Sequence, residues 1–354
     1  MLSDRDTRLF IRLVRNGLGF VPAPTDDEAV TTESWENIYR FAADHGLNAV
    51  VWDGIQRLPR GLQPPRELRI RWALAAEQLE KRYRRQRQTA EKLAAAFAEK
   101  GIRMLILKGL GLSRDYPVPE HRECGDIDIY LFGASDQGDR ILQGLGAHLY
   151  FDVPKHSEYM WNDIAIENHR TILNVRRNKT EQELNTRLVG ILEREGTQAI
   201  GDNMSAPTAT FNAIYLLRHA AVHYQKEGIA IRHLCDWACF LERHRQQIDH
   251  AQFQEAMSAC RMDRFAALMT AAAVECLGAR VQVPEHDGQM LERFTREIFA
   301  LPPKPTGYLS RLFRKLFGPF QNRWRLRNVL RTSVWSYYYD TVRGQWNEKF
   351  TVFR

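Results

Sequence analysis

This sequence of 354 residues lacks several features that would assign it to a specialised class of protein. No apolar stretch is long enough to cross a bilayer without charges, so we expect no transmembrane segment. The five cysteines are an odd number without close pairing, so we expect free thiols in a reducing compartment. No repeat occurs at a fixed period, so a solenoid is not expected. Asp4 and Asp6 stand where a signal peptide carries positive charge, and we therefore expect a cytoplasmic protein.

The composition is that of an ordinary globular protein. Hydrophobic residues make up 44% of the chain and charged residues 26%, which predicts a soluble protein with a buried core. Judged by the usual size of a domain, a chain of this length forms roughly two or three domains.

The formal net charge of +7 is concentrated near the C-terminus. Residues 303–354 contain eleven basic and two acidic side chains, and the rest of the chain carries a charge of −2. Such a basic, aromatic-rich segment attracts polyanions, among them RNA, nucleotide phosphates and anionic membranes. A helical hairpin with a solvated arginine face explains the same composition. Trp324, Trp335 and the tyrosines at 337–339 can stack on bases, although core packing is their commoner use.

Changes in the apolar period divide the chain into four regions. Residues 1–100 have helical spacing, residues 101–178 contain short strand-like runs, residues 179–301 return to helical spacing, and residues 302–354 form the basic helical element. The strand candidates are 104–107, 126–132, 147–153 and 163–169, with one helix near 135–145. Short strands interrupted by a helix indicate a small mixed sheet. We therefore predict an α+β fold in which this sheet is flanked by an N-terminal helical region and a C-terminal helical bundle.

One of the strand candidates carries a pair of acids. Asp126 and Asp128 stand two residues apart, so both carboxylates point to one face while Ile127 and Ile129 point to a core. Neighbouring carboxylates repel one another, and Mg²⁺ or Mn²⁺, which prefer oxygen ligands, would relieve that repulsion. A metal held there can bridge the oxygens of a nucleoside triphosphate during an in-line displacement at phosphorus. Two exposed acids on an edge strand are the alternative explanation.

Other residues could complete such a site. Glu167 lies on the strand candidate 163–169 and supplies a third carboxylate, with Asp163 on the same face as its competitor. Lys108 ends the preceding strand and is followed by Gly109, where a cation and a close backbone approach would hold phosphates. Arg122 either contacts phosphate or forms a salt bridge with one of the acids.

Four short motifs follow one another between residues 107 and 131. They are Leu107-Lys108-Gly109, Tyr116-Pro117, Arg122 and Gly125-Asp126-Ile127-Asp128-Ile129. In this order they resemble the motifs of the uncharacterised nucleotidyltransferase family of bacteria, a branch of the DNA-polymerase-β-like superfamily. Weaker similarities are Glu167-Asn168-His169, the pair His219 and His223, and Leu234-Cys235-Asp236, so the resemblance covers about residues 30 to 340.

The resemblance implies a minimal nucleotidyltransferase sheet, with Asp126 and Asp128 as metal ligands and Glu167 as third ligand or general base. It implies transfer of a nucleoside monophosphate from a triphosphate such as ATP to a hydroxyl of an unidentified acceptor, which is a small molecule, a protein or RNA. The superfamily usually has a Gly-Ser pair whose serine touches the triphosphate, whereas this chain has Gly109-Leu110. Ser113 is a candidate to replace this serine, and the alternative is that its side chain faces a helix. This departure keeps open a degenerate module that binds nucleotide or RNA without turnover.

The histidines have structural alternatives. His169 shares the face of Glu167 and either reaches the acceptor or orients Glu167. His219, His223 and Asp236 are expected to form a polar network between helices. A zinc site built from the two helical histidines with Cys235 and Cys239 is a further alternative, but buried thiols are the commoner finding in apolar helices.

Overall fold

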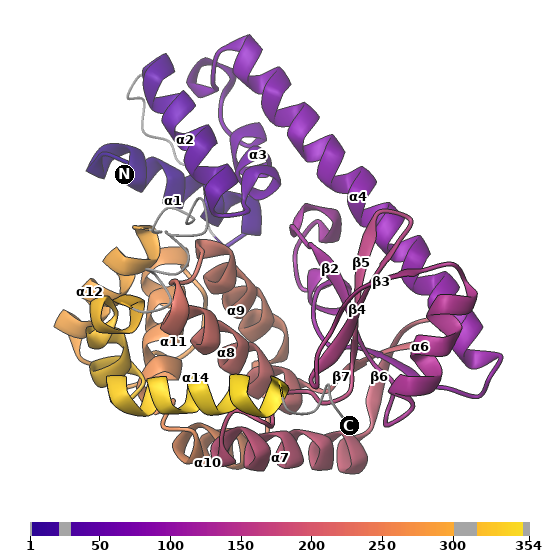
Figure 1. Cartoon of the computed structure of the whole chain (residues 1–354). Helices are drawn as coiled ribbons and strands as arrows, with labels where there is room; N and C mark the ends of the chain where they lie inside the picture. Colours follow the sequence, from indigo (N-terminus) through magenta and orange to yellow (C-terminus); the bar gives the residue numbers. More distant parts are fainter. Residues whose placement is uncertain (1, 21–29, 301–316, 350–354) are drawn as a thin grey trace.

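The computed structural model describes residues 2–20, 30–300 and 317–349, and it has helices at both ends with one seven-stranded sheet between them (Figure 1). The N-terminal helices are α1 (Asp4–Leu18), α2 (Thr32–Asp44), α3 (Asn48–Gln56) and α4 (Arg66–Ala98). The C-terminal helices are α7 (Lys179–Glu195), α8 (Ala209–Lys226), α9 (Ile231–His244), α10 (His250–Ala259), α11 (Asp263–Leu277), α12 (Gly288–Phe299) and α14 (Val334–Lys349). The α+β fold predicted from the sequence, with helices on both sides of a mixed sheet, is confirmed.

The sheet is mixed, and its strands do not follow chain order. They are β1 (Met104–Ile106), β2 (Asp126–Tyr130), β3 (His148–Asp152), β4 (His156–Trp161), β5 (Ile164–His169), β6 (Thr197–Gly201) and β7 (Met204–Pro207). The spatial order is β3-β4-β5-β2-β1-β7-β6, with β2 parallel to β5 and β1 parallel to β7. The remaining neighbours are antiparallel. Two short helices, α5 (Leu110–Ser113) and α6 (Ser135–Gly144), lie in the connections between strands.

The sheet is larger than the sequence predicted. Strands β4, β6 and β7 were not predicted, and the last two lie beyond residue 178, where we placed the end of the sheet region. Strand β6 lies at the edge of the sheet and is mostly exposed, so it has no buried face to produce an apolar alternation. The helical bundle is thus interrupted by a hairpin that returns to the sheet.

The two faces of the central strands are buried in different cores. Ile127 and Ile129 belong to a core that also contains Phe97, near the C-terminal end of α4, which confirms their predicted inward direction. On the opposite face, Leu105 and Tyr130 belong to the core of the helical bundle. Side chains alternate along a strand, so Asp126 and Asp128 share the face of Tyr130 and are directed toward the bundle.

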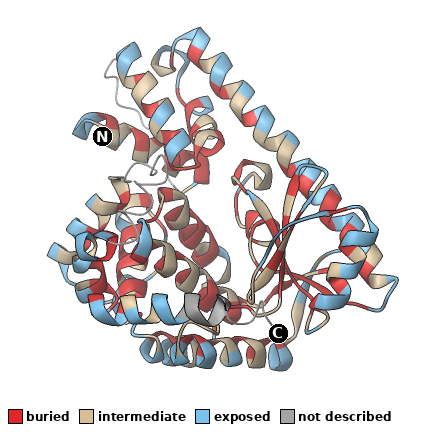
Figure 2. Cartoon of the chain, viewed as in Figure 1, coloured by how far each residue is buried: buried red, intermediate tan, exposed pale blue. Residues whose placement is uncertain are grey.

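Helix α4 links the two cores. Its first turns bury Leu68 and Trp72 with the N-terminal helices and the bundle, and its last turns bury Leu93 and Phe97 against the sheet. Figure 2 shows buried and exposed residues alternating along this helix, as expected for a helix that packs on one side only. Among the described residues, no helix has both the length and the apolar character needed to cross a bilayer.

A buried ion pair ties the loop before β2 to helix α9. The guanidinium of Arg122 donates to both carboxylate oxygens of Asp236, at 2.8 and 2.9 Å, and the Tyr116 hydroxyl donates to the same carboxylate at 2.7 Å. Burial opposes the charged form of Asp236, but Arg122 and its hydrogen bonds hold the pKa of this carboxyl below its usual value. The sequence left two roles open for Arg122, a phosphate contact or a salt bridge with a motif acid. Its ion-pair partner in the structure is neither motif acid but Asp236, 114 residues further along the chain.

Loss of one partner should leave the other charge buried and unpaired. We expect Asp236→Ala to lower the free energy of unfolding by about 3–5 kcal/mol. Glu292→Ala removes an exposed ion pair with Arg296 and serves as the control, with an expected loss of about 0–1 kcal/mol. Urea denaturation followed by circular dichroism measures both values, and equal losses in the two variants would contradict a structural role for the buried pair.

Candidate active site

Two neighbouring strands bring three carboxylates together. Strands β2 and β5 are parallel, and their register places Asp128 opposite Glu167. The carboxylate oxygens of Asp126, Asp128 and Glu167 lie within 4.8 Å of one another, on the sheet face directed toward the helical bundle. The site residues predicted from the spacing of the acids therefore meet in one cluster, called here the acid cluster.

Asp163, the competing candidate for the third acid, is not part of the acid cluster. It lies with Asn162 in the turn between β4 and β5, and its φ of 60° is typical of a tight hairpin turn. Four residues along a strand span about 13 Å, so Asp163 is at the opposite end of β5 from Glu167. The strand predicted from residue 163 begins at Ile164, because the turn takes the first residue of the alternating pattern.

Lys108 faces the acid cluster from the end of β1. Its ammonium nitrogen lies 2.9 Å from Oδ2 of Asp128 and 3.7 Å from Oδ2 of Asp126. Gly109 follows with a φ of 57°, and a Cβ atom there would lie 2.8 Å from the sulfur of Cys124. Only glycine fits this position, so the backbone can turn sharply beside the acids. Ser113 is buried and its hydroxyl donates to the carbonyl of Leu110, which favours the structural explanation for this serine.

His169 lies between two of the acids. Its Nε2 atom is 3.1 Å from Oδ1 of Asp128 and 3.2 Å from Oε2 of Glu167, and its side chain is fully buried. On the next strand, Nδ1 of His156 is 3.8 Å from the same oxygen of Glu167. His169 is therefore placed to orient the two carboxylates, and a second group of possible metal ligands is formed by His156, Glu167 and His169.

The charges in the cluster shift the pKa of each acid differently. Burial raises the pKa of Asp126, and the neighbouring charge of Asp128 adds to this effect. Burial also opposes the charged form of Asp128, but Lys108 and the hydrogen bond from His169 hold its pKa well below the usual value. Burial raises and His169 lowers the pKa of Glu167, and the net shift is downward. Asp128 and Glu167 are thus held as anions, and Asp126 is the acid most easily protonated.

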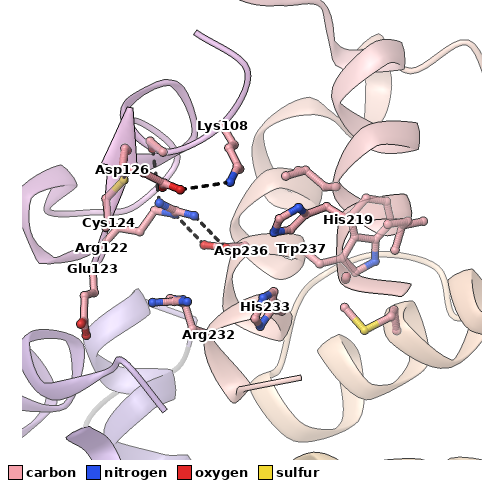
Figure 3. A pocket seen from close by; sticks show the side chains of 16 residues that line it. Lys108, Arg122, Glu123, Cys124, Asp126, His219, Arg232, His233, Asp236 and Trp237 are labelled. Atoms are coloured by element: carbon pink, nitrogen blue, oxygen red, sulfur yellow. Dashed lines mark hydrogen bonds and ion pairs between the residues drawn. The ribbon is translucent and has the colours of Figure 1, made fainter. Parts of the chain in front are cut away.

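A small cavity opens beside Lys108 and Asp126. It has a volume of about 90 Å³ and is also lined by Gly109, Arg122 and Arg232 (Figure 3). Figure 3 shows that the sheet side supplies the lysine and the acid, while helices α8 and α9 supply His219, Asp236 and their neighbours. This cavity, called here the first cavity, is therefore enclosed by sheet and bundle together.

The helical histidines form a cluster that differs from the predicted network. The ring of His219 lies 4.7 Å from that of His223 and 6.2 Å from that of His233, measured between centroids. Asp236 is not part of this cluster because it pairs with Arg122. Burial lowers the pKa of His219 well below its usual value and that of His233 to about 3, so both rings are uncharged at neutral pH.

Zinc binding through cysteine finds no support in the described part of the chain. The possible metal-ligand groups there are formed by carboxylates and histidines alone, and Cys235 and Cys239 are buried free thiols. Both sulfur atoms lie in the apolar core of the bundle, which raises the pKa of each thiol well above its usual value.

Sequence reasoning missed residues that come from elements far from the motif. Tyr215 on α8 is buried, and the charges of Asp128, Lys108 and Glu167 act on its hydroxyl, so it lies near the acid cluster. His156 was missed because strand β4 was not predicted. Tyr215 and His219 are four residues apart, which predicts that they lie on one face of a helix. A single sequence does not show which element that face packs against.

The basic C-terminal element is only partly described. Lys304, Arg311, Arg314, Lys315 and Arg354 lie outside the described residues, and so no contact is assigned to them. Arg325 is buried and pairs with Glu297 at 2.6 Å, so it does not contribute to a basic surface. Trp335 and Tyr339 are 72% and 65% exposed, whereas Tyr337 is buried. The aromatic residues thus divide between core packing and surface.

Comparison with known proteins agrees with this arrangement. The family model described as "Uncharacterised nucleotidyltransferase" matches residues 31–278, which is more than half of the chain. Searches of the curated proteins and of the solved structures gave no match. The matched segment contains the whole sheet, the acid cluster and the helices that enclose the first cavity. This chain belongs to the uncharacterised nucleotidyltransferase family.

Proposed function

We propose that the protein is a Mg²⁺- or Mn²⁺-dependent enzyme that transfers a nucleoside monophosphate from a nucleoside triphosphate to a hydroxyl of an acceptor. The observation that carries this proposal is the meeting of Asp126, Asp128 and Glu167 within 4.8 Å on one face of the sheet. All three donors are carboxylates, and hard divalent cations prefer such oxygen ligands. The alternative group of His156, Glu167 and His169 has two imidazoles, which suit softer transition metals.

In this proposal the residues of the chain divide the work between binding and proton transfer. Asp126 and Asp128 hold the metal, and Glu167 acts as third ligand or as general base, with His169 fixing its orientation. When bound, the metal would neutralise charge that develops on the phosphate oxygens. Lys108 and the backbone at Gly109 hold the phosphates in the first cavity. Arg122 adds positive charge there and fixes the loop through Asp236.

The proposed reaction is an in-line displacement at the α-phosphorus. The hydroxyl oxygen of the acceptor bonds to that phosphorus, and the bond from the phosphorus to the oxygen shared with the β-phosphate breaks. Pyrophosphate leaves with this oxygen, and the hydroxyl proton passes to Glu167 when this residue acts as the base. Positioning and charge neutralisation supply the rate enhancement.

A second candidate function follows from one observation at the same site. Leu110 occupies the place where the superfamily has a serine, and the buried hydroxyl of Ser113 donates to the carbonyl of Leu110. A protein with this change could bind nucleotide or RNA without turnover. We further propose that residues 303–354 bind RNA or another polyanion. A cytoplasmic location agrees with the five unpaired cysteines.

Removal of one cluster acid should abolish transfer. We expect Asp126→Asn to lower pyrophosphate release from a nucleoside triphosphate in the presence of Mn²⁺ by about 10³-fold or more, because a metal supplies several kcal/mol of charge stabilisation. Asp163→Asn is the matched control, since it is the same substitution at the competing candidate acid, which lies in the β4–β5 turn outside the acid cluster. Pyrophosphate release is measured with a coupled assay. If wild type binds nucleotide without releasing pyrophosphate or labelling any lysate component, the binding module is the correct function.

Substitution of Lys108 should change the affinities for metal ion and nucleotide in opposite directions. Its ammonium lies 2.9 Å from Asp128, so it competes with a metal ion for the acids. We expect Lys108→Met to tighten Mn²⁺ binding in the absence of nucleotide by about tenfold, which is about 1.4 kcal/mol. The same variant should weaken binding of the nucleoside triphosphate. Isothermal titration calorimetry measures both affinities.

Lys81→Met is the control for the Lys108 variant, because Lys81 is 52% exposed and pairs with Glu77 on its own helix. Neither affinity should change in this control. Weaker Mn²⁺ binding in Lys108→Met would show that the lysine supports the metal site instead of competing with the metal.

A further inference from the structure

A second cavity, of about 300 Å³, lies between the sheet and the C-terminal helices. Helix α8 contributes to both cavities: Leu216 and Ala220 line the first, whereas Arg218 and Val222 line the second. His219 is the one residue shared by the two linings. The two cavities therefore lie on different sides of α8, and Asp126 of the acid cluster lines the first.

The second cavity is electropositive, and it is called here the cationic cavity. Its charged lining residues are Lys155, Arg177, Glu181, Arg218, Lys226 and Asp340. Four of these six side chains are cations and two are anions. A cavity with an excess of positive charge and low-dielectric walls attracts anionic ligands.

The two arginines are incompletely neutralised. The side chains of Arg177 and Arg218 are 13% and 11% exposed, and both pair with the single carboxylate of Glu181. Burial lowers the pKa of Arg177, and Tyr337 and Asp340 offset only part of this effect. Nearby, the carboxylate of Asp340 on α14 accepts a hydrogen bond from Asn178. A bound anion would supply the missing negative charge.

The two lysines have no ion-pair partner in the described part of the chain. Lys155 immediately precedes His156, and the charges of Asp128 and Glu167 in the acid cluster act on its ammonium group. Burial lowers the pKa of Lys155 in spite of these acids. Lys226, another of the four cations that line the cavity, is exposed near the C-terminus of α8. The cations thus extend from the acid cluster outward.

The cationic cavity approaches the acid cluster through Lys155. This lining residue directly precedes His156, whose Nδ1 atom lies 3.8 Å from Oε2 of Glu167. The charges of Asp128 and Glu167 act on both Lys155 and Tyr215, which also lines the cavity. The first cavity instead lies beside Lys108 and Asp126. If the phosphates of the triphosphate lie at Lys108 beside the first cavity, a molecule in the cationic cavity approaches from the side of Lys155 and His156, next to the proposed base.

We propose that the cationic cavity is the acceptor subsite, and that the acceptor is a small molecule which carries a phosphate monoester and presents its hydroxyl to Glu167. This inference rests on the proposed function. Two arginines recognise phosphate through paired N–H donors, and lysines add point charges, so the side chains suit this group. A volume of about 300 Å³ suits a small molecule, and α14 contributes Asp340 and Thr341 to the wall. The C-terminal helix is then part of the acceptor site.

The test measures binding and does not require turnover. Isothermal titration of the full chain with glycerol 3-phosphate should show binding that glycerol does not show. Arg177→Gln and Lys155→Gln should each weaken that binding about tenfold or more. Lys179→Gln is the matched control, because Lys179 is 86% exposed and does not line the cavity. This variant should bind glycerol 3-phosphate with the affinity of wild type. Circular dichroism of each variant checks that the chain is folded.

Nucleotide titrations with Mn²⁺ separate this proposal from the proposed function. Unchanged nucleotide affinity in Arg177→Gln and Lys155→Gln, together with weakened glycerol 3-phosphate binding, supports the acceptor subsite. Equal weakening of both ligands would mean that the cavity holds the triphosphate, and this overturns the subsite. Nucleotide binding without any glycerol 3-phosphate binding also overturns the subsite but leaves the proposed function standing. Absence of nucleotide binding removes the proposed function, and with it the acceptor role. Tighter binding of a phosphoserine peptide or of RNA than of glycerol 3-phosphate overturns the small-molecule assignment.

Discussion

Repulsion among three carboxylates on one sheet face is the constraint around which the site is built. The parallel register of β2 and β5 places Asp128 beside Glu167, and the two-residue period adds Asp126 to the same face. Lys108 and His169 supply the compensating contacts. Burial and the charge of Asp128 raise the pKa of Asp126, whose side chain is nevertheless the most exposed of the three. In the proposed function, a metal ion would enter beside Asp126, the most exposed of the three acids.

The same face explains why the helical bundle belongs to the site. Ile127 and Ile129 fill a core on the side of α4, so the acids can only point to the opposite side, where α8 and α9 pack. Arg122 fixes the distance between the motif loop and α9 through the buried carboxylate of Asp236. Cavities then form on two sides of α8, one beside Lys108 and one lined by cations. The sheet provides the charges, and the helices shape the space in which those charges act.

Local patterns allowed the sequence to predict one part of this arrangement well. The period of two in β2 and β5 identified the acids and the direction of their side chains, and helical spacing located the long helices. Prediction failed where the signal was weak or distant. Strand β6 is an exposed edge without a buried face, and Asp163 was drawn into a strand although a tight turn takes that residue. Tyr215 and Lys155 reach the site through tertiary packing, as does the pairing of Asp236 with Arg122, and such packing leaves no short-range trace in the sequence.

Helix α4 has a further consequence for the molecule as a whole. One end of this 33-residue helix is buried among the N-terminal helices, and the other end is buried against the sheet. Because each core buries part of the same helix, we expect the two cores to unfold in one cooperative event. A substitution that disturbs the packing of Trp72 is therefore expected to affect the packing of Ile127, which lies on the other face of the strand that carries the acids.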